Sequence, residues 1–339
     1  VGARGGLALN SCTAGLHLAL LTLGVGPGDE VITTPMTFCA SVNVIEHVGA
    51  RPVLVDVEPD TLNIDPSRVE KAITPRTKCL MPVHFSGQPC DMDPLLLLAG
   101  NHGLKVVEDA AHAVAASYRG RMVGTIGDLT AFSFYATKNL TTAEGGMLTG
   151  EPKLLEHARV LSLHGMSKDA WRRYGRGGSW FYEVIAPGFK YNMTDIQASI
   201  GLQQLRRLDG FQKRRREIAA AYSQEFSKHP YFQTPTERPD VVSSWHLYVL
   251  RLNREALRIG RDTFIEELAA LNIGASVHFI PIHLHPYYRT KYAYGPDDFP
   301  VAFANYRRTI SLPLHPKLTD SDVQDVIDAV LRVAGSNRA

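Results

Sequence analysis

The sequence lacks any long hydrophobic run. None of its apolar stretches reaches the roughly 18 residues that a membrane-spanning helix needs, and no signal-peptide pattern opens the chain. The first residue is Val1, and the strand-like residues 7–10 follow almost at once. We therefore expect a protein that makes no membrane contact and whose natural chain has further residues before Val1.

Cysteine is scarce as well. The four cysteines, Cys12, Cys39, Cys79 and Cys90, are far apart and form no CxxC pair, and no histidines are paired at metal-ligand spacing. This pattern predicts reduced thiols in a cytoplasmic protein rather than a disulfide framework, and it indicates no metal site.

Neither sign of charge is in excess. The chain has 36 basic and 34 acidic residues and a formal net charge of +2, so a general attraction to nucleic acid is not indicated. The densest basic run, residues 213–216, falls in a helical pattern and is predicted to be a solvated helix face. Residues 24–30 are rich in glycine but contain no GxGxxG that opens a helix after a strand, so a nicotinamide dinucleotide site is not supported.

What the chain does have is a regular alternation of strands and helices in its first half. Strand patterns at residues 30–34, 52–57, 78–83 and 104–109 are separated by helical patterns. This alternation predicts an α/β domain with a largely parallel sheet, in which ligands bind beyond the carboxyl ends of the strands.

A long helical pattern begins after Thr194. Gln197 lies at capping-box spacing from Thr194, and an irregular stretch rich in Gly and Arg is expected before the helix, over residues 165–180. The helix is long enough to bridge two domains. Its predicted apolar face comprises Ile196, Ile200, Leu205, Leu208, Ile218, Tyr222 and Phe226.

The rest of the chain predicts a second, smaller unit. Strands are expected at residues 246–252 and 275–280, and helices at residues 261–272 and 320–334. With 339 residues, 45% of them hydrophobic, the chain can bury two cores. We predict a large α/β domain over residues 1–208 and a small α+β domain over residues 209–339.

Lys138 lies at the centre of the stretch that carries most of the chemistry, residues 130–147. Alternating strand residues lead into it, and it closes on Gly145 and Gly146, which we expect to adopt turn conformations closed to other residues. A lysine held among apolar and aromatic neighbours loses its proton more readily and can form an imine with an aldehyde, as a pyridoxal-phosphate enzyme requires. Taken alone, this lysine is better explained as one that snorkels from a strand end.

Two further candidates lie where strands end. A helix is expected to begin just after Thr13, where unpaired N–H groups, the helix dipole and the Thr13 hydroxyl would suit a phosphate; alternatively, Ser11 or Thr13 only caps the helix. Asp109 ends an apolar strand, where it could hold a protonated pyridine nitrogen or cap a helix. Thr13, Asp109 and Lys138 fall on one predicted edge of one sheet, and together they favour cofactor chemistry.

These segments together resemble the DegT/DnrJ/EryC1/StrS family of sugar aminotransferases over essentially the whole chain. The matching stretches are GVGPGDEVI, GARPVLVDV, AITPRTK, PVHFSGQPCDMD, VVEDAAHA, FSFYATKNLTTAEGG, YNMTDIQAS and SLPLHP. The resemblance implies fold type I, the aspartate aminotransferase-like fold of transferases that use pyridoxal 5'-phosphate (PLP). Within the family, NSCTAG, VVEDAAHAV and GFKYNMTDIQ are most similar to the branch that aminates C4 of a nucleotide-linked 4-keto sugar, such as UDP-4-amino-4-deoxy-L-arabinose aminotransferases.

The resemblance also implies roles for the matching residues. Lys138 would form the imine with PLP and move protons between cofactor and substrate carbons, Asp109 would pair with the pyridine nitrogen, and His112 would lie near the phenolic oxygen. The remaining predicted cofactor contacts are Phe38 on the ring, Thr13, Ala14 and Ser133 at the phosphate, and Asn192, which would reach the phosphate from the neighbouring subunit. A homodimer with shared active sites follows from the last of these.

The implied reaction is a ping-pong transamination. L-Glutamate would convert PLP to pyridoxamine 5'-phosphate, and the amino group would then pass to a nucleotide-linked keto sugar, at C4 of a 4-keto sugar. His278, His283 and Tyr287 are candidate substrate contacts, although each is also explained as a structural residue.

Three other functions fit parts of the pattern. A 3-keto sugar or inosose aminotransferase would differ only in the shape of the acceptor pocket. The family's C3-dehydratase branch carries histidine in place of the lysine, so Lys138 argues against it. A non-catalytic, PLP-binding regulatory protein would share the fold, but no helix-turn-helix or basic tail supports it.

Overall fold

The computed structural model describes residues 1–167 and 181–339. The irregular stretch predicted at residues 165–180 lies mostly outside the described residues.

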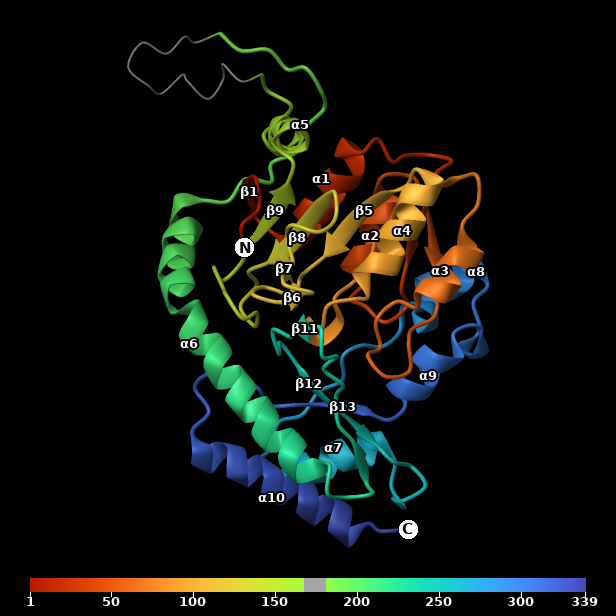
Figure 1. The fold of residues 1–339 in the computed structure, drawn as a ribbon, viewed down its shortest axis with the longest axis vertical. Helices are drawn as coiled ribbons and strands as arrows, with labels where there is room; N and C mark the ends of the chain where they lie inside the picture. Colours follow the sequence, from red (N-terminus) through yellow and green to blue (C-terminus); the bar gives the residue numbers. More distant parts are fainter. Residues whose placement is uncertain (168–180) are drawn as a thin grey trace.

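A seven-stranded sheet forms the centre of the larger part of the molecule (Figure 1). Its strand order is β1 (Gly6–Leu9), β9 (Gly146–Gly150), β8 (Leu129–Ser133), β5 (Lys105–Asp109), β4 (Thr77–Leu80), β2 (Glu30–Thr33) and β3 (Arg51–Leu54). Strand β9 alone runs against its two neighbours, and all other pairs are parallel. The predicted, largely parallel sheet is therefore confirmed, although the strands expected to reach residues 57 and 83 end at Leu54 and Leu80.

Helices cover both faces of this sheet. Adjacent strand residues belong to different cores: Val31 packs with α1 (Cys12–Thr22), α2 (Ala40–His47) and α5 (Pro152–Ser162), whereas Ile32 packs with α3 (Pro66–Ala72) and α4 (Met92–His102). Because successive strand side chains point to opposite faces, near-continuous apolar strands of this kind need cover on both sides. The fold is the α/β arrangement that the sequence predicts.

The carboxyl ends of β1, β5 and β8 lie at the same edge of the sheet. Strand β1 is antiparallel to β9, β9 is antiparallel to β8, and β8 is parallel to β5, so β1, β8 and β5 share one direction. The segments that follow these strands carry Thr13, Asp109 and Lys138, which therefore lie at this edge.

Helix α6 (Asp195–Phe226) is 32 residues long and contacts two separate cores (Figure 1). The predicted capping box is confirmed, since Thr194 Oγ1 accepts from the Gln197 N–H and the Gln197 side chain accepts from the Thr194 N–H. Leu208 packs in the cluster around Phe132 and Phe134 beside the large sheet, and the residues from Ile218 onward pack in the second core. The predicted apolar face is therefore buried from Leu208 onward.

The first half of the predicted α6 face is exposed instead. Ile196, Ile200 and Leu205 are open to solvent in the single chain. Residues 213–216 also differ from the prediction of a solvated face, because Arg215 is buried and its Nη1 donates to the carbonyl groups of Trp245, His246 and Leu314. A run of four residues exceeds one helical turn, so one of its side chains must face inward.

The second core lies between a small antiparallel sheet and the helices α6, α7 (Arg261–Ala270) and α10 (Asp320–Ser336). This sheet has the order β10 (Phe232–Gln233), β12 (Tyr248–Leu252) and β13 (Thr309–Leu312). A further small sheet joins β11 (Val241–Val242) to β6 (Ser117–Tyr118) and β7 (Arg121–Met122). The domain boundary at residue 208 stays a prediction.

The strand predicted at residues 275–280 is wrong. Only Ser276 pairs there, in a single bridge to Ser311, and the chain continues to the short 3₁₀ helices η3 (Ile282–Leu284) and η4 (Pro296–Asp298) and to α8 (Pro286–Tyr292) and α9 (Pro300–Tyr306). His278 and Phe279 line a cavity instead of extending a sheet. The alternation of apolar residues in this segment therefore reflects contact with the cavity and not pairing in a sheet.

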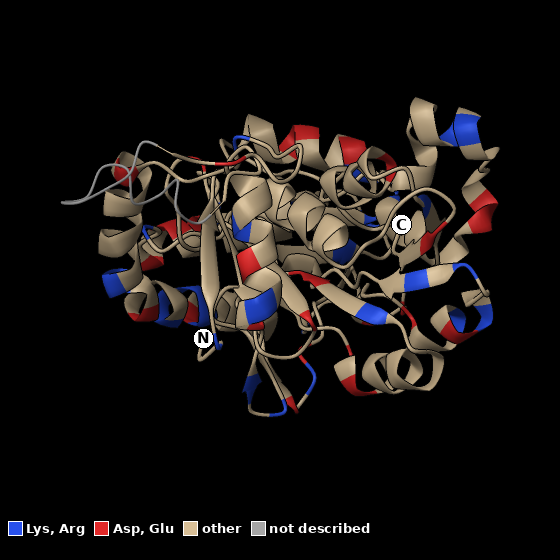
Figure 2. Ribbon diagram, turned by 90° about the horizontal axis from the view of Figure 1, so that it is seen from above, with Lys and Arg blue, Asp and Glu red and all other residues tan. Residues whose placement is uncertain are grey.

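Several general features limit the kinds of site to consider. Within residues 1–167 and 181–339, none of the helices combines the length and apolarity that a bilayer crossing requires. The same part of the chain holds no group of three or more His, Cys, Asp or Glu side chains arranged for a metal ion, and all four cysteines are free thiols. Basic and acidic residues are interspersed along the ribbon (Figure 2).

Candidate active site

The predicted cofactor residues gather around one cavity of about 440 Å³ at the carboxyl edge of the large sheet. Those that line it are Thr13, Phe38, Asp109, His112, Ser133, Lys138 and the substrate candidate His278. They come from five separate segments of the chain, so the fold, rather than any local motif, brings them together.

Lys138 lies in the turn that follows β8. Its N–H donates to the Tyr135 carbonyl at 3.0 Å, and the loop is closed by bonds from the Phe134 N–H to Gly145 and from the Thr142 N–H to Phe134, each 2.8 Å. Burial lowers the pKa of Lys138 to about 8, against the opposing effect of Cys12 and Asp109. An amine in this position is unprotonated far more often at neutral pH than a surface lysine.

The glycines that close this loop do not act as predicted. Neither Gly145 nor Gly146 has a positive φ; the left-handed position in the loop is Ala143, at φ 65°. Gly146 is needed for close approach, because a Cβ there would lie 2.5 Å from the Ser11 carbonyl carbon and 2.6 Å from the Cys12 nitrogen. This contact seats β9 against the start of α1.

Asp109 ends β5 and is buried. Ser41 Oγ donates to its Oδ2 at 2.7 Å, and the Ala111 N–H donates to its Oδ1 at 3.1 Å. Burial raises the pKa of Asp109, although both hydrogen bonds and the Lys138 charge act against it. No helix lies between β5 and β6 in the described chain, so the alternative that Asp109 caps a helix is wrong. The carboxyl group instead accepts from the turn after β5 and lines the cavity, where a cation would stabilise its ionised form.

His112 is held in one tautomer by the main chain. The Ser86 N–H donates to His112 Nδ1 at 3.2 Å, so the ring proton is assigned to Nε2. Burial lowers the pKa of His112 well below its ordinary value. A neutral imidazole that can donate from Nε2 therefore lies at the cavity wall.

The start of α1 forms another part of the wall. Ser11 is the N-cap, and its Oγ accepts from the Ala14 N–H at 3.1 Å. The capping interpretation of Ser11 is thus correct, and the helix begins at Cys12 rather than after Thr13. Thr13 is exposed and Ser133 is buried, and both line the cavity, whereas Ala14 does not line it and its N–H already donates to Ser11 Oγ.

Phe38 presents an open aromatic face. Its side chain is 59% exposed although it lines the cavity, and its ring centroid lies 6.1 Å from that of Phe279. An aromatic ring left open inside a cavity suits a planar ligand that stacks on it.

The other predicted contacts do not reach this cavity within one chain. His283 is buried against Phe299, with ring centroids 4.8 Å apart, and Tyr287 is exposed on α8. Asn192 donates through Nδ2 to the Met193 carbonyl, so a cofactor contact by Asn192 would have to be made across a subunit boundary. His278 does line the cavity, and its Nδ1 lies 2.9 Å from Ser311 Oγ.

Sequence reasoning missed several residues of the site. Ser41, the hydrogen-bond donor to Asp109, lies one turn after Phe38 in the chain, and that spacing could have indicated it. His246 lines the same cavity but is 108 residues from Lys138, and no local pattern marks it.

A second cavity adjoins the first on the other side of Lys138. It is a groove of about 890 Å³ between the lysine loop, α6 and residues 311–317. Arg207, His315 and Lys317 contribute to its lining, and no Asp or Glu is present among the described residues that line it. An anionic group would meet only neutral or basic side chains there.

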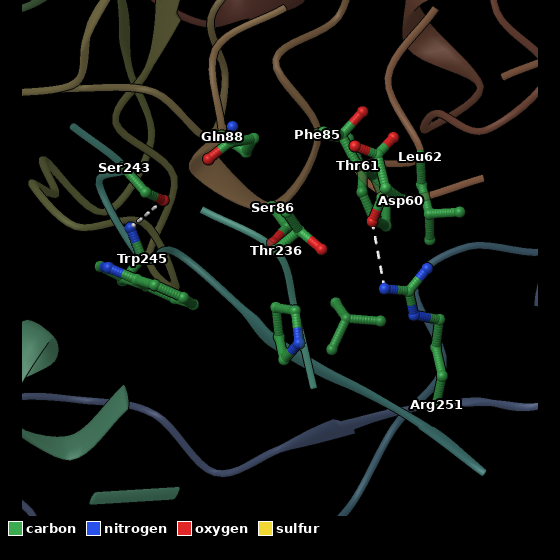
Figure 3. Close-up of a pocket in the computed structure, with 12 residues that line it drawn as sticks. Asp60, Thr61, Leu62, Phe85, Ser86, Gln88, Thr236, Ser243, Trp245 and Arg251 are labelled. Carbon is green, nitrogen blue, oxygen red and sulfur yellow. Dashed lines mark hydrogen bonds between the residues drawn. The ribbon is translucent and has the colours of Figure 1, made fainter. Parts of the chain in front are cut away.

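A third cavity is too small for a substrate. Figure 3 shows it between Gln88, Trp245 and Arg251, with Arg251 Nη2 donating to the Asp60 carbonyl at 3.1 Å. Its volume is about 20 Å³, and neither polar atom of the buried Gln88 side chain has a hydrogen-bond partner among the described residues. These features suit one buried water molecule.

The residues around the 440 Å³ cavity fit PLP by their chemistry. A buried carboxyl group suits a pyridinium nitrogen, an amine of lowered pKa suits an aldehyde, an open phenyl ring suits a planar heterocycle, and hydroxyl groups at a helix start suit a phosphate. Each of these four requirements is met by a residue described above.

Comparison with known proteins agrees with this fit. A family model described as the DegT/DnrJ/EryC1/StrS aminotransferase family matches residues 1–331. The chain is 57% identical over 332 residues to the spore coat polysaccharide biosynthesis protein SpsC of Bacillus subtilis (strain 168), which covers 97% of this chain and 85% of that protein.

Solved structures show the same relationship. The candidate sugar aminotransferase Spr1654 from Streptococcus pneumoniae in its PLP form is 37% identical, with a TM-score of 0.91 over 98% of this chain and 88% of that chain. Its pyridoxamine-phosphate form is 38% identical, with a TM-score of 0.92 over the same shares. The fold is fold type I, and the chain belongs to the DegT/DnrJ/EryC1/StrS family of PLP-dependent sugar aminotransferases.

Proposed function

We propose that this protein transfers an amino group from L-glutamate to a nucleotide-linked keto sugar, at C4 of a 4-keto sugar, by a ping-pong mechanism. The observation that carries the proposal is the pairing, in one cavity, of the buried Lys138 amine with the buried Asp109 carboxyl group. When bound, PLP supplies an aldehyde and a ring that withdraws electrons from the neighbouring carbon atom.

The residues of the chain divide the remaining tasks. Lys138 accepts and returns a proton at its Nζ, which its lowered pKa makes possible near neutral pH. Asp109, held by Ser41, would pair with the ring nitrogen of the cofactor and favour its protonated form, and His112 would donate from Nε2 to the phenolic oxygen. Phe38 orients the ring, and Thr13 and Ser133 bind the phosphate at the start of α1.

The groove beside Lys138 supports an anionic, nucleotide-linked acceptor. Arg207, His315 and Lys317 lie along it without a facing carboxylate among the described residues, so a diphosphate would be attracted and not repelled. The printed names of similar proteins, a spore coat polysaccharide biosynthesis protein and a sugar aminotransferase, support a sugar as the acceptor.

The exposed half of α6 supports a homodimer. Ile196, Leu202 and Leu205 are large apolar side chains on the surface of the single chain, close in sequence to the exposed Val184 and Ile185. Apolar area of this extent is stabilised by a second copy of the chain, and Asn192 would then contact the partner's cofactor. Four free thiols are in keeping with a cytoplasmic enzyme.

The test is a two-step spectroscopic experiment. Protein reconstituted with PLP is expected to show a visible band that L-glutamate abolishes, and the Lys138→Ala variant is expected to show no such response. The protein freed of glutamate is then offered nucleotide-linked 4-keto and 3-keto sugars, and the product is identified by NMR.

Each outcome of the test decides between functions. Return of the band with the 4-keto sugar supports the proposal, whereas a response only to the 3-keto sugar assigns the alternative acceptor. If the band forms but no amino donor changes it, the proposal is overturned, and a different PLP reaction or a regulatory PLP-binding role is indicated.

A further inference from the structure

His246 is a buried titratable group of the cavity to which the proposed chemistry assigns no role. It lies two residues before β12, it is 7% exposed, and its Nε2 is 3.5 Å from Lys138 Nζ. This distance is at the long end of a hydrogen bond, and such contacts shorten when a catalytic site is loaded.

The partners of Asn139 fix the tautomer of His246. Asn139 Nδ2 donates to Gln212 Oε1 at 3.0 Å and to the Ser244 carbonyl at 2.7 Å, which uses both of its N–H groups. Its Oδ1 therefore faces His246 Nδ1, at 3.0 Å. An amide oxygen only accepts, so Nδ1 carries the ring proton and Nε2 presents its lone pair to Lys138.

The side chains of this network are buried and held in place by hydrogen bonds. Asn139 and Gln212 are both 4% exposed, and Gln212 Nε2 donates to the Val114 carbonyl at 3.4 Å, which sets the orientation of the Gln212 amide. Burial lowers the pKa of His246 well below its ordinary value, and the nearby His112 and Lys138 act in the same direction. The ring therefore stays neutral over the pH range in which Lys138 titrates.

We propose that His246 is a positioning residue for Lys138, with its Nε2 accepting a hydrogen bond from Nζ and the Asn139–Gln212 pair keeping that ring nitrogen unprotonated. One N–H of the amine points at His246 in both protonation states. When the amine is neutral, its lone pair is then directed away from His246 and into the cavity, where the cofactor would be held. The inference rests on the proposed role of Lys138 and adds a residue that orients it.

The charges that face Lys138 set the expected sign of the effect. Cys12 of α1 and Asp109 of β5 raise the pKa of Lys138, while His112, His278 and the more distant Arg215 of α6 lower the pKa of His246. Tyr135 and Glu144 also line the cavity beside Lys138. An acceptor at Nε2 favours the ammonium form. Removing it is expected to lower the pKa of Lys138 further.

Two substitutions separate orientation from packing. His246→Gln places an amide oxygen near the former Nε2 position and retains an acceptor for Lys138. His246→Asn places its amide near the former Nδ1 position, so it retains the bond to Asn139 but leaves Lys138 without an acceptor. Both variants replace the aromatic ring with a primary amide, so a role confined to filling space does not predict that only His246→Asn changes the titration of Lys138.

The first readout uses the cofactor-free protein. The rate of acylation of Lys138 by acetic anhydride, followed by peptide mass spectrometry against pH, gives the titration midpoint of the amine. We expect His246→Asn to lower this midpoint by about one unit and His246→Gln to move it by less than about a third of a unit. Equal midpoints in the two variants, or a wild-type midpoint in His246→Asn, would overturn the proposal.

The second readout uses the PLP-loaded protein. We expect His246→Asn to lower kcat of the glutamate half-reaction about 10- to 100-fold with KM changed less than about threefold, and His246→Gln to recover most of that loss. A change confined to KM contradicts an orienting role.

A measurement on the wild-type chain keeps the proposal testable if His246→Asn fails to fold. In protein labelled with ¹⁵N-histidine, the His246 signals, assigned with the His246→Gln variant, should show the proton on Nδ1 from pH 6 to 9. A proton on Nε2 overturns the inference. Neither this experiment nor the acylation depends on which donor or sugar is used, so their failure is distinct from failure of the proposed function.

Discussion

Two buried ionisable side chains, Lys138 and Asp109, have pKa values that burial moves toward each other. The pKa of Lys138 falls to about 8, and the pKa of Asp109 rises. In each case burial disfavours the charged form, and the opposite charge of the other group limits the shift. The cavity therefore holds an amine and a carboxyl group whose charged forms are both disfavoured by burial. A ligand of opposite charge would stabilise the charged form of either group.

The lowered pKa of Lys138 predicts the pH dependence of cofactor loading. Only the unprotonated amine reacts with the aldehyde, so the rate of PLP incorporation into cofactor-free protein should rise about tenfold per pH unit below pH 8 and level off above it. Absorbance at a fixed PLP concentration between pH 6 and 10 measures this. A rate that keeps rising toward pH 10.5 would show that the amine behaves as an exposed lysine, and Lys138→Ala serves as the blank.

Asp109→Asn should separate stability from activity. The amide preserves the shape of the carboxyl group, and Ser41 Oγ can turn to accept from it, so the free energy of unfolding of the cofactor-free protein should change by about 1 kcal/mol or less. The rate of the glutamate half-reaction should fall about 1000-fold, because the ring nitrogen loses its anionic partner.

Thermal unfolding and stopped-flow absorbance check the two halves of this prediction. Ser41→Ala is the matched control: it keeps the Asp109 charge and removes only the 2.7 Å hydrogen bond, so a loss of about tenfold is expected. An Asp109→Asn protein that retains wild-type turnover would contradict the role of the carboxylate.

At the level of single residues, the sequence predicts mainly those functional residues that lie at or just after the end of a strand. Thr13, Asp109 and Lys138 could be placed because each ends or closely follows a strand of the same sheet, whereas Ser133 was indicated only by the family resemblance. The role of Gly146 was misjudged, since the need for a missing Cβ comes from a helix start over 130 positions earlier in the chain. His246 could not be found, because its distance from Lys138 depends on how the second core packs.

The contact between strand β9 and the start of helix α1 can be tested by a substitution at Gly146. In Gly146→Ala, the new Cβ would press on the backbone of Ser11 and Cys12, so either the strand or the helix start must shift. We expect a loss of about 1–3 kcal/mol in the free energy of unfolding, together with weaker binding of PLP through its phosphate, measured by chemical denaturation and by cofactor titration.

Gly100→Ala is the matched control for this prediction. Gly100 lies within α4, and a Cβ there would have no atom within 4 Å, so the substitution should stabilise the protein slightly. Equal behaviour of the two variants would show that the contact between Gly146 and the start of α1 has no energetic weight.

Element prediction was most successful where both faces of a strand are buried. The central strands and their helices could be predicted from apolar runs at regular spacing. The capping box of α6 could be predicted from the spacing of Thr194 and Gln197. The segment at residues 275–280 has the same alternation of apolar residues, but its side chains line a cavity. The pattern alone does not show whether such side chains pack inside a sheet or face a ligand.

For the whole molecule, the exposed face of α6 predicts the state of association. The wild-type protein should have twice the chain mass of 37.4 kDa by light scattering after size exclusion, and Leu205→Glu, at a side chain 57% exposed, should shift it to the monomer. A charge placed inside an apolar interface has no partner there.

The control for this prediction lies on another surface. Leu97 on α4 is 65% exposed, and Leu97→Glu should leave the mass unchanged. If Leu205→Glu retains the wild-type mass, or if the wild-type protein is a monomer, the α6 face is not the interface between subunits.

The separation of Lys138 from the residues that shield it also has a consequence for the order of events during synthesis. The hairpin of β8 and β9 holds the lysine loop through contacts within 22 residues of chain, from Leu129 to Gly150, whereas His246, His278 and Phe279 close the cavity from far downstream. A nascent chain that has made only the hairpin therefore carries a hydrated amine of ordinary basicity. The Lys138 amine becomes reactive toward aldehydes only when these downstream residues have closed the cavity around it. An incomplete chain therefore does not capture free aldehydes in the cell.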